Sequence, residues 1–417
     1  MRRLLPVVVV VVAVWASGCS FYIGDLLEEA RVNVAEGEGE GEGQEGEGEG
    51  EEGEGEGEGE EGEGETDPAC EEEERLVIVR DDSVDVLQVF DLVPNRFVRR
   101  RPAGVVGNVN LENDDGLAVN GFGVDSFALG TAGRLYLTGG SFLYQLDAAT
   151  LTQESIAGKP QVRSGGSAFT VQVVAGNVVM AGNQLDMFPE GAPIGTVTTE
   201  ITGPNDDYHR SVRFTVGAED FIAVNGRFGY VVLSSTAGAP PSPTVVYDED
   251  FTENRFHEYG GGTFHPRGIA FDNTTKKLLL GDEGRVIVLE HANGFAIDPA
   301  DDSADFVLPN AAESWVQAIA TRGGFAWVLF ERSADNLMKL DLSVSPPVAV
   351  DVATVDTDSF GRSITVGCKR VVVASFNQII AVDRNDLSPI TSLAITDLEH
   401  IAIFSRTALG LDGDDGT

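Results

Sequence analysis

The feature that most constrains the fold is a pattern of short apolar runs that recurs along residues 75–404. Each unit has a first run, a turn with glycine, a second run, a third run that ends in Asp, and a short fourth run. The clearest copy contains Ser126–Leu129, Leu135–Thr138 and Leu143–Asp147, and closes near Ser155–Ile156. Almost nothing in the region has the helical period. The pattern therefore predicts an all-β domain made of four-stranded repeats.

Six complete units follow one another, and their first strands are spaced by about 43 to 55 residues, close to the period of β-propeller blades. The first strands after the clearest copy are predicted at Phe169–Val171, Val212–Phe214, Gly268–Phe271, Ala318–Ala320 and Ser363–Val366. The fourth unit is longer, and its prolines at 240–243 indicate an inserted surface loop.

Two incomplete pieces remain at the ends of the repeat region. Leu76–Val79 and Val86–Asp91 are predicted to be a second and a third strand, and His400–Phe404 is predicted to be a first strand. Together they complete a seventh blade, so the fold expected is a seven-bladed β-propeller closed by a C-terminal strand. Closure would leave no open sheet edge between the two chain ends. An open solenoid is the alternative, and it would need capping units that the sequence does not contain.

Several units resemble the YVTN-type β-propeller repeat. Residues 136–139, Tyr-Leu-Thr-Gly, followed by Leu146 and Asp147, are the best match, and Val371–Ser375 with Val382 and Asp383 is a weaker one. No unit carries the whole motif. The resemblance implies a propeller and does not imply a ligand.

The first nineteen residues read as an export signal. Two arginines precede an apolar run at Val7–Val14, which is too short to span a membrane but suits a signal peptide. Residues 16–19, Ala-Ser-Gly-Cys, resemble the lipobox of bacterial lipoproteins, although the family usually has Leu where this chain has Ala16. The resemblance implies lipidation of Cys19, and Ser20 after it favours the outer membrane, facing the periplasm or the cell surface. An ordinary secretory signal is the alternative.

Glu36–Glu65 contains only Glu, Gly and one Gln, so it has no apolar surface to bury and is expected to be disordered. The chain between Cys19 and Cys70 would span roughly 35–45 Å as a Gly-rich coil. The formal net charge of −40 argues against nucleic acid as a partner. A solvated spacer is the interpretation preferred here; a collector of divalent cations or a docking tail is the alternative.

These observations divide the chain into five parts. They are a signal peptide at 1–18, an anchor and short lead-in at 19–35, an acidic linker at 36–69, the propeller at 70–405 and a flexible acidic tail at 406–417.

With Cys19 lipidated, the two remaining cysteines are Cys70 and Cys368. In the repeat alignment both precede a second strand, in adjacent blades, so they are expected on the same rim. The sequence predicts a disulfide between them in an oxidising compartment. Two unpaired thiols are the alternative, because spacing does not establish the geometry of a bridge.

A candidate binding site lies at one mouth of the central channel, where the loops before the first strands meet. Those loops carry polar and aromatic residues, three of the five histidines among them: Asp125, Ser126, His209, Arg210, His265, Arg267, Glu313, Trp315, Arg362, Glu399 and His400. Such residues suit an anionic or polar ligand, and neutral imidazoles suit a metal. The alternative is that polar loop residues only solvate the channel.

No cofactor is expected. Two Asp-rich segments are candidates for calcium, but neither has the full ligand spacing. They are Asp298, Asp301, Asp302 and Asp305, and the tail residues Asp412, Asp414 and Asp415. P-loop, zinc, nucleophile-elbow and dinucleotide motifs are absent from the sequence.

The sequence thus favours a lipid-anchored, exported, monomeric propeller that binds or scaffolds proteins or surface glycans at the cell envelope. The prediction leans away from an enzyme. The alternatives are a channel-mouth enzyme, such as a metal-dependent lactonase or a glycan hydrolase or lyase, and an accessory factor for outer-membrane assembly.

Overall fold

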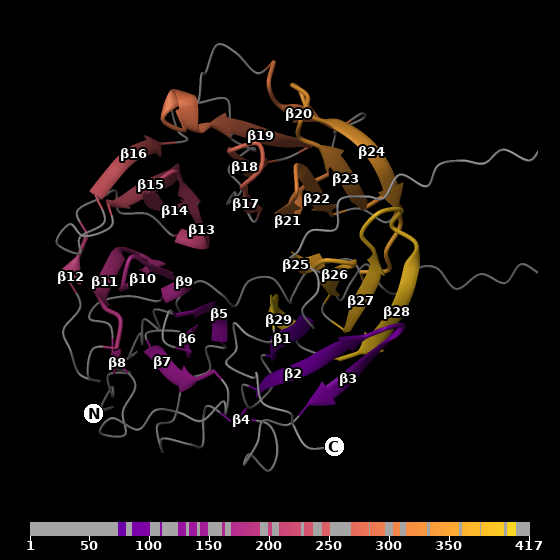
Figure 1. The fold of residues 1–417 in the computed structure, drawn as a ribbon, viewed down its shortest axis with the longest axis horizontal. Helices are drawn as coiled ribbons and strands as arrows, with labels where there is room; N and C mark the ends of the chain where they lie inside the picture. The colour runs from indigo at the N-terminus through magenta and orange to yellow at the C-terminus, as the bar shows by residue number, and fades with distance from the viewer. Residues whose placement is uncertain are drawn as a thin grey trace, which may run out of the picture. The chain divides into compact units, whose positions relative to one another are not determined.

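Seven antiparallel sheets surround a common centre in the computed structural model (Figure 1). All of them belong to the compact unit formed by residues 64–417. The structure describes residues 74–80, 86–100, 109–110, 124–130, 133–139, 142–148, 161–162, 168–191, 199–201, 208–226, 229–236, 244–250, 268–282, 284–296, 303–308, 314–331, 334–357, 361–375, 377–395 and 398–405. The predicted leader, Cys19, the Glu-Gly linker, Cys70, the proline cluster and the acidic tail lie outside these residues.

We number the sheets as blades 1 to 7 and give their strands from the centre outward. Blade 1 combines the two chain ends and contains β29 (Leu398–Ser405), β1 (Glu74–Arg80), β2 (Val86–Val93) and β3 (Arg96–Arg100), with β4 (Val109–Asn110) also paired to β2. Blade 2 contains β5 (Val124–Leu129), β6 (Arg134–Gly139), β7 (Phe142–Asp147) and β8 (Gln161–Val162). Blade 3 contains β9 (Ala168–Val174), β10 (Asn177–Gly182), β11 (Leu185–Pro189) and β12 (Thr199–Glu200). Blade 4 contains β13 (Tyr208–Val216), β14 (Glu219–Gly226), β15 (Gly229–Thr236) and β16 (Thr244–Asp250).

The remaining blades follow the same order. Blade 5 contains β17 (Ile269–Asp272), β18 (Lys277–Asp282), β19 (Arg285–Glu290) and β20 (Phe306–Val307), with the short 3₁₀ helix η3 (His291–Asn293) after β19. Blade 6 contains β21 (Val316–Arg322), β22 (Phe325–Phe330), β23 (Leu337–Asp341) and β24 (Val348–Ala353). Blade 7 contains β25 (Gly361–Val366), β26 (Arg370–Ser375), β27 (Gln378–Asp383) and β28 (Pro389–Ala394). The seven-bladed propeller predicted from the repeat count is therefore confirmed.

The described part of the last strand of blade 2 is β8 at Gln161–Val162. Ser155–Ile156, where that strand was predicted to close the unit, lies outside the described residues. The two residues of β8 pair with Leu143 and Phe142, at the beginning of β7.

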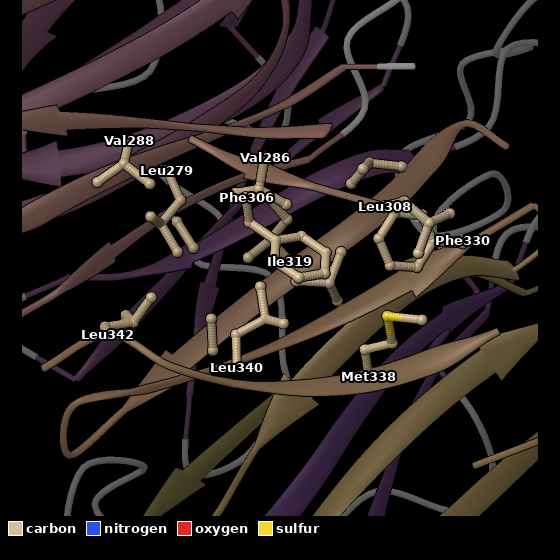
Figure 2. Packing of buried hydrophobic residues seen from close by; sticks show 14 residues of the cluster. Leu279, Val286, Val288, Phe306, Leu308, Ile319, Phe330, Met338, Leu340 and Leu342 are labelled. Atoms are coloured by element: carbon tan, nitrogen blue, oxygen red, sulfur yellow. The ribbon is translucent and has the colours of Figure 1, made fainter. Parts of the chain in front are cut away.

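The second strands read as continuous apolar runs because both of their faces are covered. Every residue of β10, β18 and β26 is buried. Figure 2 shows one interior contact, in which Leu279, Val286 and Phe306 of blade 5 pack near Ile319, Phe330 and Leu340 of blade 6. An alternating pattern would have placed polar side chains between two sheets, where they would lose hydration.

Tight hairpins join the first and second strands in several blades. In blade 6, Arg322 pairs with Phe325, so only Gly323 and Gly324 form the turn. Both have positive φ, at 62° and 82°, which two-residue hairpin turns of type I′ require and which glycine adopts without a steric penalty.

The ring closes by pairing β29 with β1. Ser405 pairs with Glu74, and the ladder continues to Leu398 opposite Arg80. On the blade 7 side, Ile401 and Leu398 share an apolar cluster with Val372 and Ala381. The predicted complementarity of the two chain ends is confirmed, and the seam has a packed core.

In two blades, a basic side chain at the start of the second strand forms a hydrogen bond to the next blade. Lys277 donates from Nζ to the carbonyl of Leu342 at 2.7 Å, from blade 5 to blade 6. Arg370 donates from Nη1 to the carbonyl of Val93 at 3.1 Å, from blade 7 to blade 1. The second bond crosses the seam, so the contact that joins the chain ends resembles an interior blade contact.

Candidate functional site

Six of the seven innermost strands carry a β-bulge near their first residue. In β13, for example, Tyr208 pairs with Gly226 and Arg210 pairs with Asn225, so His209 is the extra residue. We call the six extra residues the bulge ring, which consists of Asp125, Phe169, His209, Gln317, Arg362 and Glu399. In blade 5, the residues before Gly268 are outside the described ranges. Bulges redirect side chains and are frequent next to functional sites.

The bulge ring contains or adjoins most of the predicted channel-mouth residues that the structure describes. His209, Arg362 and Glu399 are bulge residues, and Arg210 and His400 are the residues that follow two of the bulges. Trp315 is half-buried just before β21, and its carbonyl accepts a hydrogen bond from the Glu331 amide at 2.8 Å. His265, Arg267 and Glu313 lie outside the described residues. Strand register places these five residues at the same end of their inner strands, and a binding site there stays a prediction.

The His400 side chain lies against blade 2. Its ring meets Phe127 edge to face, with ring centroids 4.7 Å apart and an interplanar angle of 74°. Atom Nδ1 is buried and has no hydrogen-bond partner among the described residues. Burial lowers the pKa of His400 to about 3, and the positive charge of Arg210 contributes in the same direction. The imidazole is therefore neutral near pH 7.

Arg210 and His400 come from opposite parts of the ring. Arg210 is in blade 4 and His400 in blade 1, and three steps is the largest separation in a ring of seven blades. The positive charge of Arg210 nevertheless contributes to the lowered pKa of His400, although burial is the larger cause.

Sequence reasoning missed several polar residues at this end of the inner strands. Thr170 Oγ1 and Ser211 Oγ form a hydrogen bond of 2.5 Å between blades 3 and 4. Gln317, which is almost fully buried, donates from Nε2 to Glu331 Oε2. Gln317 is the bulge residue of blade 6, and Thr170 follows the bulge of blade 3. Aligning the repeat units at the second residue of each first strand would have placed Thr170 and Gln317 beside the predicted site residues.

No group of three or more His, Cys, Asp or Glu side chains gathers in the part of the chain that the structure describes. Of the first Asp-rich segment only Asp305 is described. It is buried, and its Oδ1 accepts a hydrogen bond from the Val288 amide at 3.2 Å. The rest of both Asp-rich segments lies outside the described residues, so calcium binding stays a prediction.

A groove of about 640 Å³ lies elsewhere, between the outer strands of blades 5 and 6. Its walls are mostly apolar and include Val307, Met338, Pro346 and Val348. It contains none of the bulge-ring residues.

The described residues contain no helix whose length and apolar character would let it cross a membrane.

Cys368 lies in the turn between β25 and β26 and is buried. Its amide donates to Glu74 Oε1 at 2.5 Å, and its sulfur lies 3.0 Å from Arg322 Nη2. Glu74 begins β1, so the start of the second strand of blade 1 meets the turn before the second strand of blade 7, as the repeat alignment predicted. The partner proposed for Cys368, Cys70, lies four residues before Glu74, outside the described residues.

Comparison with known proteins shows similarity only among solved structures. No family model matches the sequence, and no curated protein matches it. Apo AztD from Citrobacter koseri has a TM-score of 0.48 and 11% identity, over 80% of this chain and 98% of that chain. The computationally designed protein Ika8 has a TM-score of 0.47 and 9% identity, over 78% and 90%. PorZ, a surface component of the type-IX secretion system of Porphyromonas gingivalis, has a TM-score of 0.42 and 14% identity, over 67% and 34%. The fold assignment rests on the strand order of the seven blades, not on these likenesses.

Proposed function

We propose that this chain is an exported, lipid-anchored β-propeller that binds a protein or surface glycan at the cell envelope through its channel mouth. The observation that carries the binding part is the bulge ring, which places polar residues from several blades at one end of the inner strands. The apolar leader and Cys19 support export and lipidation, and Ser20 supports the outer membrane. A triacylated cysteine would exceed the roughly two chains that stable anchoring needs.

The topology supports the channel mouth as the exposed end. The bulge of β29 is at Glu399, and the same strand ends at Ser405 opposite Glu74, where the chain begins its first blade. The strand between them is about 20 Å long. A tether that ends before Glu74 therefore joins the propeller at the rim opposite the bulge ring, so it would leave the channel mouth open to a partner.

A disulfide between Cys70 and Cys368 is part of this proposal. The contact between Glu74 and Cys368 brings the chain near the sulfur, and four extended residues reach about 13 Å at most. The bridge would join the end of the tether to the rim of blade 7, beside the seam.

Two experiments test the proposal. Replacing Cys19 with Ser should abolish labelling with radioactive palmitate, and unchanged labelling would exclude the anchor. For binding, purified protein is cross-linked to envelope fractions, and the variants Arg362→Glu and Lys369→Glu are compared. Both exchange one positive charge for a negative one in blade 7, at opposite rims.

We expect Arg362→Glu to reduce capture of the partner and Lys369→Glu to leave it unchanged. Equal capture by both variants would exclude the channel mouth as the binding surface. Stoichiometric metal in purified protein, together with hydrolysis of a lactone or glycan, would instead favour the enzyme alternative.

A further inference from the structure

We propose that the groove between the outer strands of blades 5 and 6 binds the apolar face of a positively charged amphipathic helix from a partner protein. No bulge-ring residue lines this groove. It is therefore a second surface, apart from the channel mouth, and its partner is additional to the one in the proposed function.

Exposed apolar side chains are concentrated at this groove. Among the described residues, six large apolar side chains are exposed. Five of them are Val307 on β20 and the four valines at positions 344, 348, 350 and 352 of blade 6; the sixth is Val246 in blade 4. Single exposed apolar residues are ordinary on protein surfaces, whereas a group of them in one place marks an interaction site.

A short outer strand leaves room for the groove. β20 has two residues and β24 has six, so most of β24 has no outer strand of blade 5 beside it. Phe306 and Met338, which belong to the core between the two blades (Figure 2), also line the groove. Its volume of about 640 Å³ is within the range of roughly 300–1,000 Å³ that is usual for ligand sites. It therefore has room for a few side chains of a partner.

The edge of β24 is protected against pairing with another strand. Val350 is the extra residue of a β-bulge in the ladder with β23. The Val352 amide donates to Asp351 Oδ1 at 2.8 Å, so it is not available to an added strand. Pro346 and Pro347, just before β24, have no amide hydrogen to donate. Such features prevent edge-to-edge pairing. A partner would therefore contact the valine side chains, as a helix in a groove does, without extending the sheet.

The charge of the chain favours a cationic partner. Asp305, which is 4% exposed, is the one ionisable residue among the described residues that line the groove, and no Lys or Arg is among them. The formal net charge of −40 attracts a cationic partner and repels a second copy of the same chain. These charges support a basic helix, rather than a second propeller, as the occupant.

A synthetic amphipathic helix of leucine and lysine, with its leucines on one face, is the probe. It is labelled, mixed with the purified full chain and followed by fluorescence anisotropy. A salt concentration of about 0.15 M limits attraction between exposed charges to a range of about 8 Å. The same peptide with glutamate in place of every lysine is the charge control. We expect saturable binding of the leucine–lysine peptide and none of the leucine–glutamate peptide.

The double variant Val307→Thr/Val348→Thr tests the location, because it changes one exposed side chain in each of the two blades. Threonine keeps the branched shape that strands favour and replaces one methyl group with a hydroxyl. We expect it to weaken binding about fivefold or more, as two partly buried methyl groups would. Val246→Thr is the matched control, since Val246 is 48% exposed and Val348 47%, and both are in outer strands. It should change the affinity less than twofold, and circular dichroism shows that each variant is folded.

Four results would overturn the proposal. They are no saturable binding, equal binding of the leucine–glutamate peptide, equal losses in the double variant and in Val246→Thr, and unchanged binding by the double variant. The last would mean that the peptide binds elsewhere, for instance on the Glu-Gly segment. A dimer in sedimentation equilibrium that the double variant dissociates would also overturn it, by assigning the groove to a second copy. If these tests fail while capture of envelope partners depends on Arg362, the proposed function is unaffected.

Discussion

Replacing Arg370 with Met tests how the ring is held closed. Arg370 is only 6% exposed, and its Nη1 donates to the Val93 carbonyl at 3.1 Å across the seam. Methionine keeps much of the aliphatic stem and removes the donors and the charge. A hydrogen bond from a charged group contributes about 1.5–3 kcal/mol. Burial lowers the pKa of the guanidinium, which shows that desolvation offsets part of this gain. We expect the free energy of unfolding to fall by about 2 kcal/mol.

Urea unfolding followed by circular dichroism and tryptophan fluorescence measures this change, with the midpoint converted through the slope of each curve. Lys277→Met is the matched variant, because Lys277 makes the same bond to Leu342 between two interior blades at 2.7 Å. Similar losses in both variants are expected. A surface substitution usually changes the free energy of unfolding by less than about 0.5 kcal/mol. If Arg370→Met has only such an effect while Lys277→Met lowers stability, the bond from Arg370 to Val93 does not hold the seam.

Three further predictions follow from the described contacts. Gly281→Ala should lower stability by about 1–3 kcal/mol in thermal unfolding, since its Cβ would lie 2.5 Å from Val316 Cγ1; an unchanged melting temperature would contradict this. His400 has its pKa lowered from 6.5 to about 3, so between these values the unfolded chain binds a proton that the folded protein does not. Stability should therefore fall as pH decreases through this window, by up to about 1.4 kcal/mol per pH unit, and His400→Gln should flatten the slope. Non-reducing peptide mapping should recover Cys70 linked to Cys368, and reduction should remove stability on the order of 5 kcal/mol in the chain-entropy model; recovery of free Cys70 would refute the bridge.

The fold was largely predictable because its signal is repeated. The first, second and third strands of the blades were located from apolar runs, and the incomplete pieces at Leu76–Val79 and His400–Phe404 predicted the composite blade that the structure contains. The outer strands carried less information. β8, for example, has two described residues and pairs on one side only, so apolar content and period give little information about its bounds.

The candidate site was predictable by position but not by contact. The sequence analysis placed the loops before the first strands, with His209, Arg362 and Glu399, at one end of the channel. The strand register puts these three residues at the same end of their strands. Sequence reasoning missed Gln317 and Thr170, because neither residue type suggests a ligand without knowledge of the bulge. The hydrogen bond between Thr170 and Ser211 could not be predicted, since it depends on how two neighbouring blades pack against each other.

The sequence by itself determined the number of blades, the strand that closes the ring and the rim on which each loop emerges. The number of blades follows from the period of the sequence repeat. The closing strand follows from the need to pair the backbone groups at every sheet edge. Only the tertiary structure decided which groups meet across blades, such as Arg370 with the Val93 carbonyl and Thr170 with Ser211. Those meetings depend on the rotation between sheets and on the bulges, which local sequence preferences do not specify.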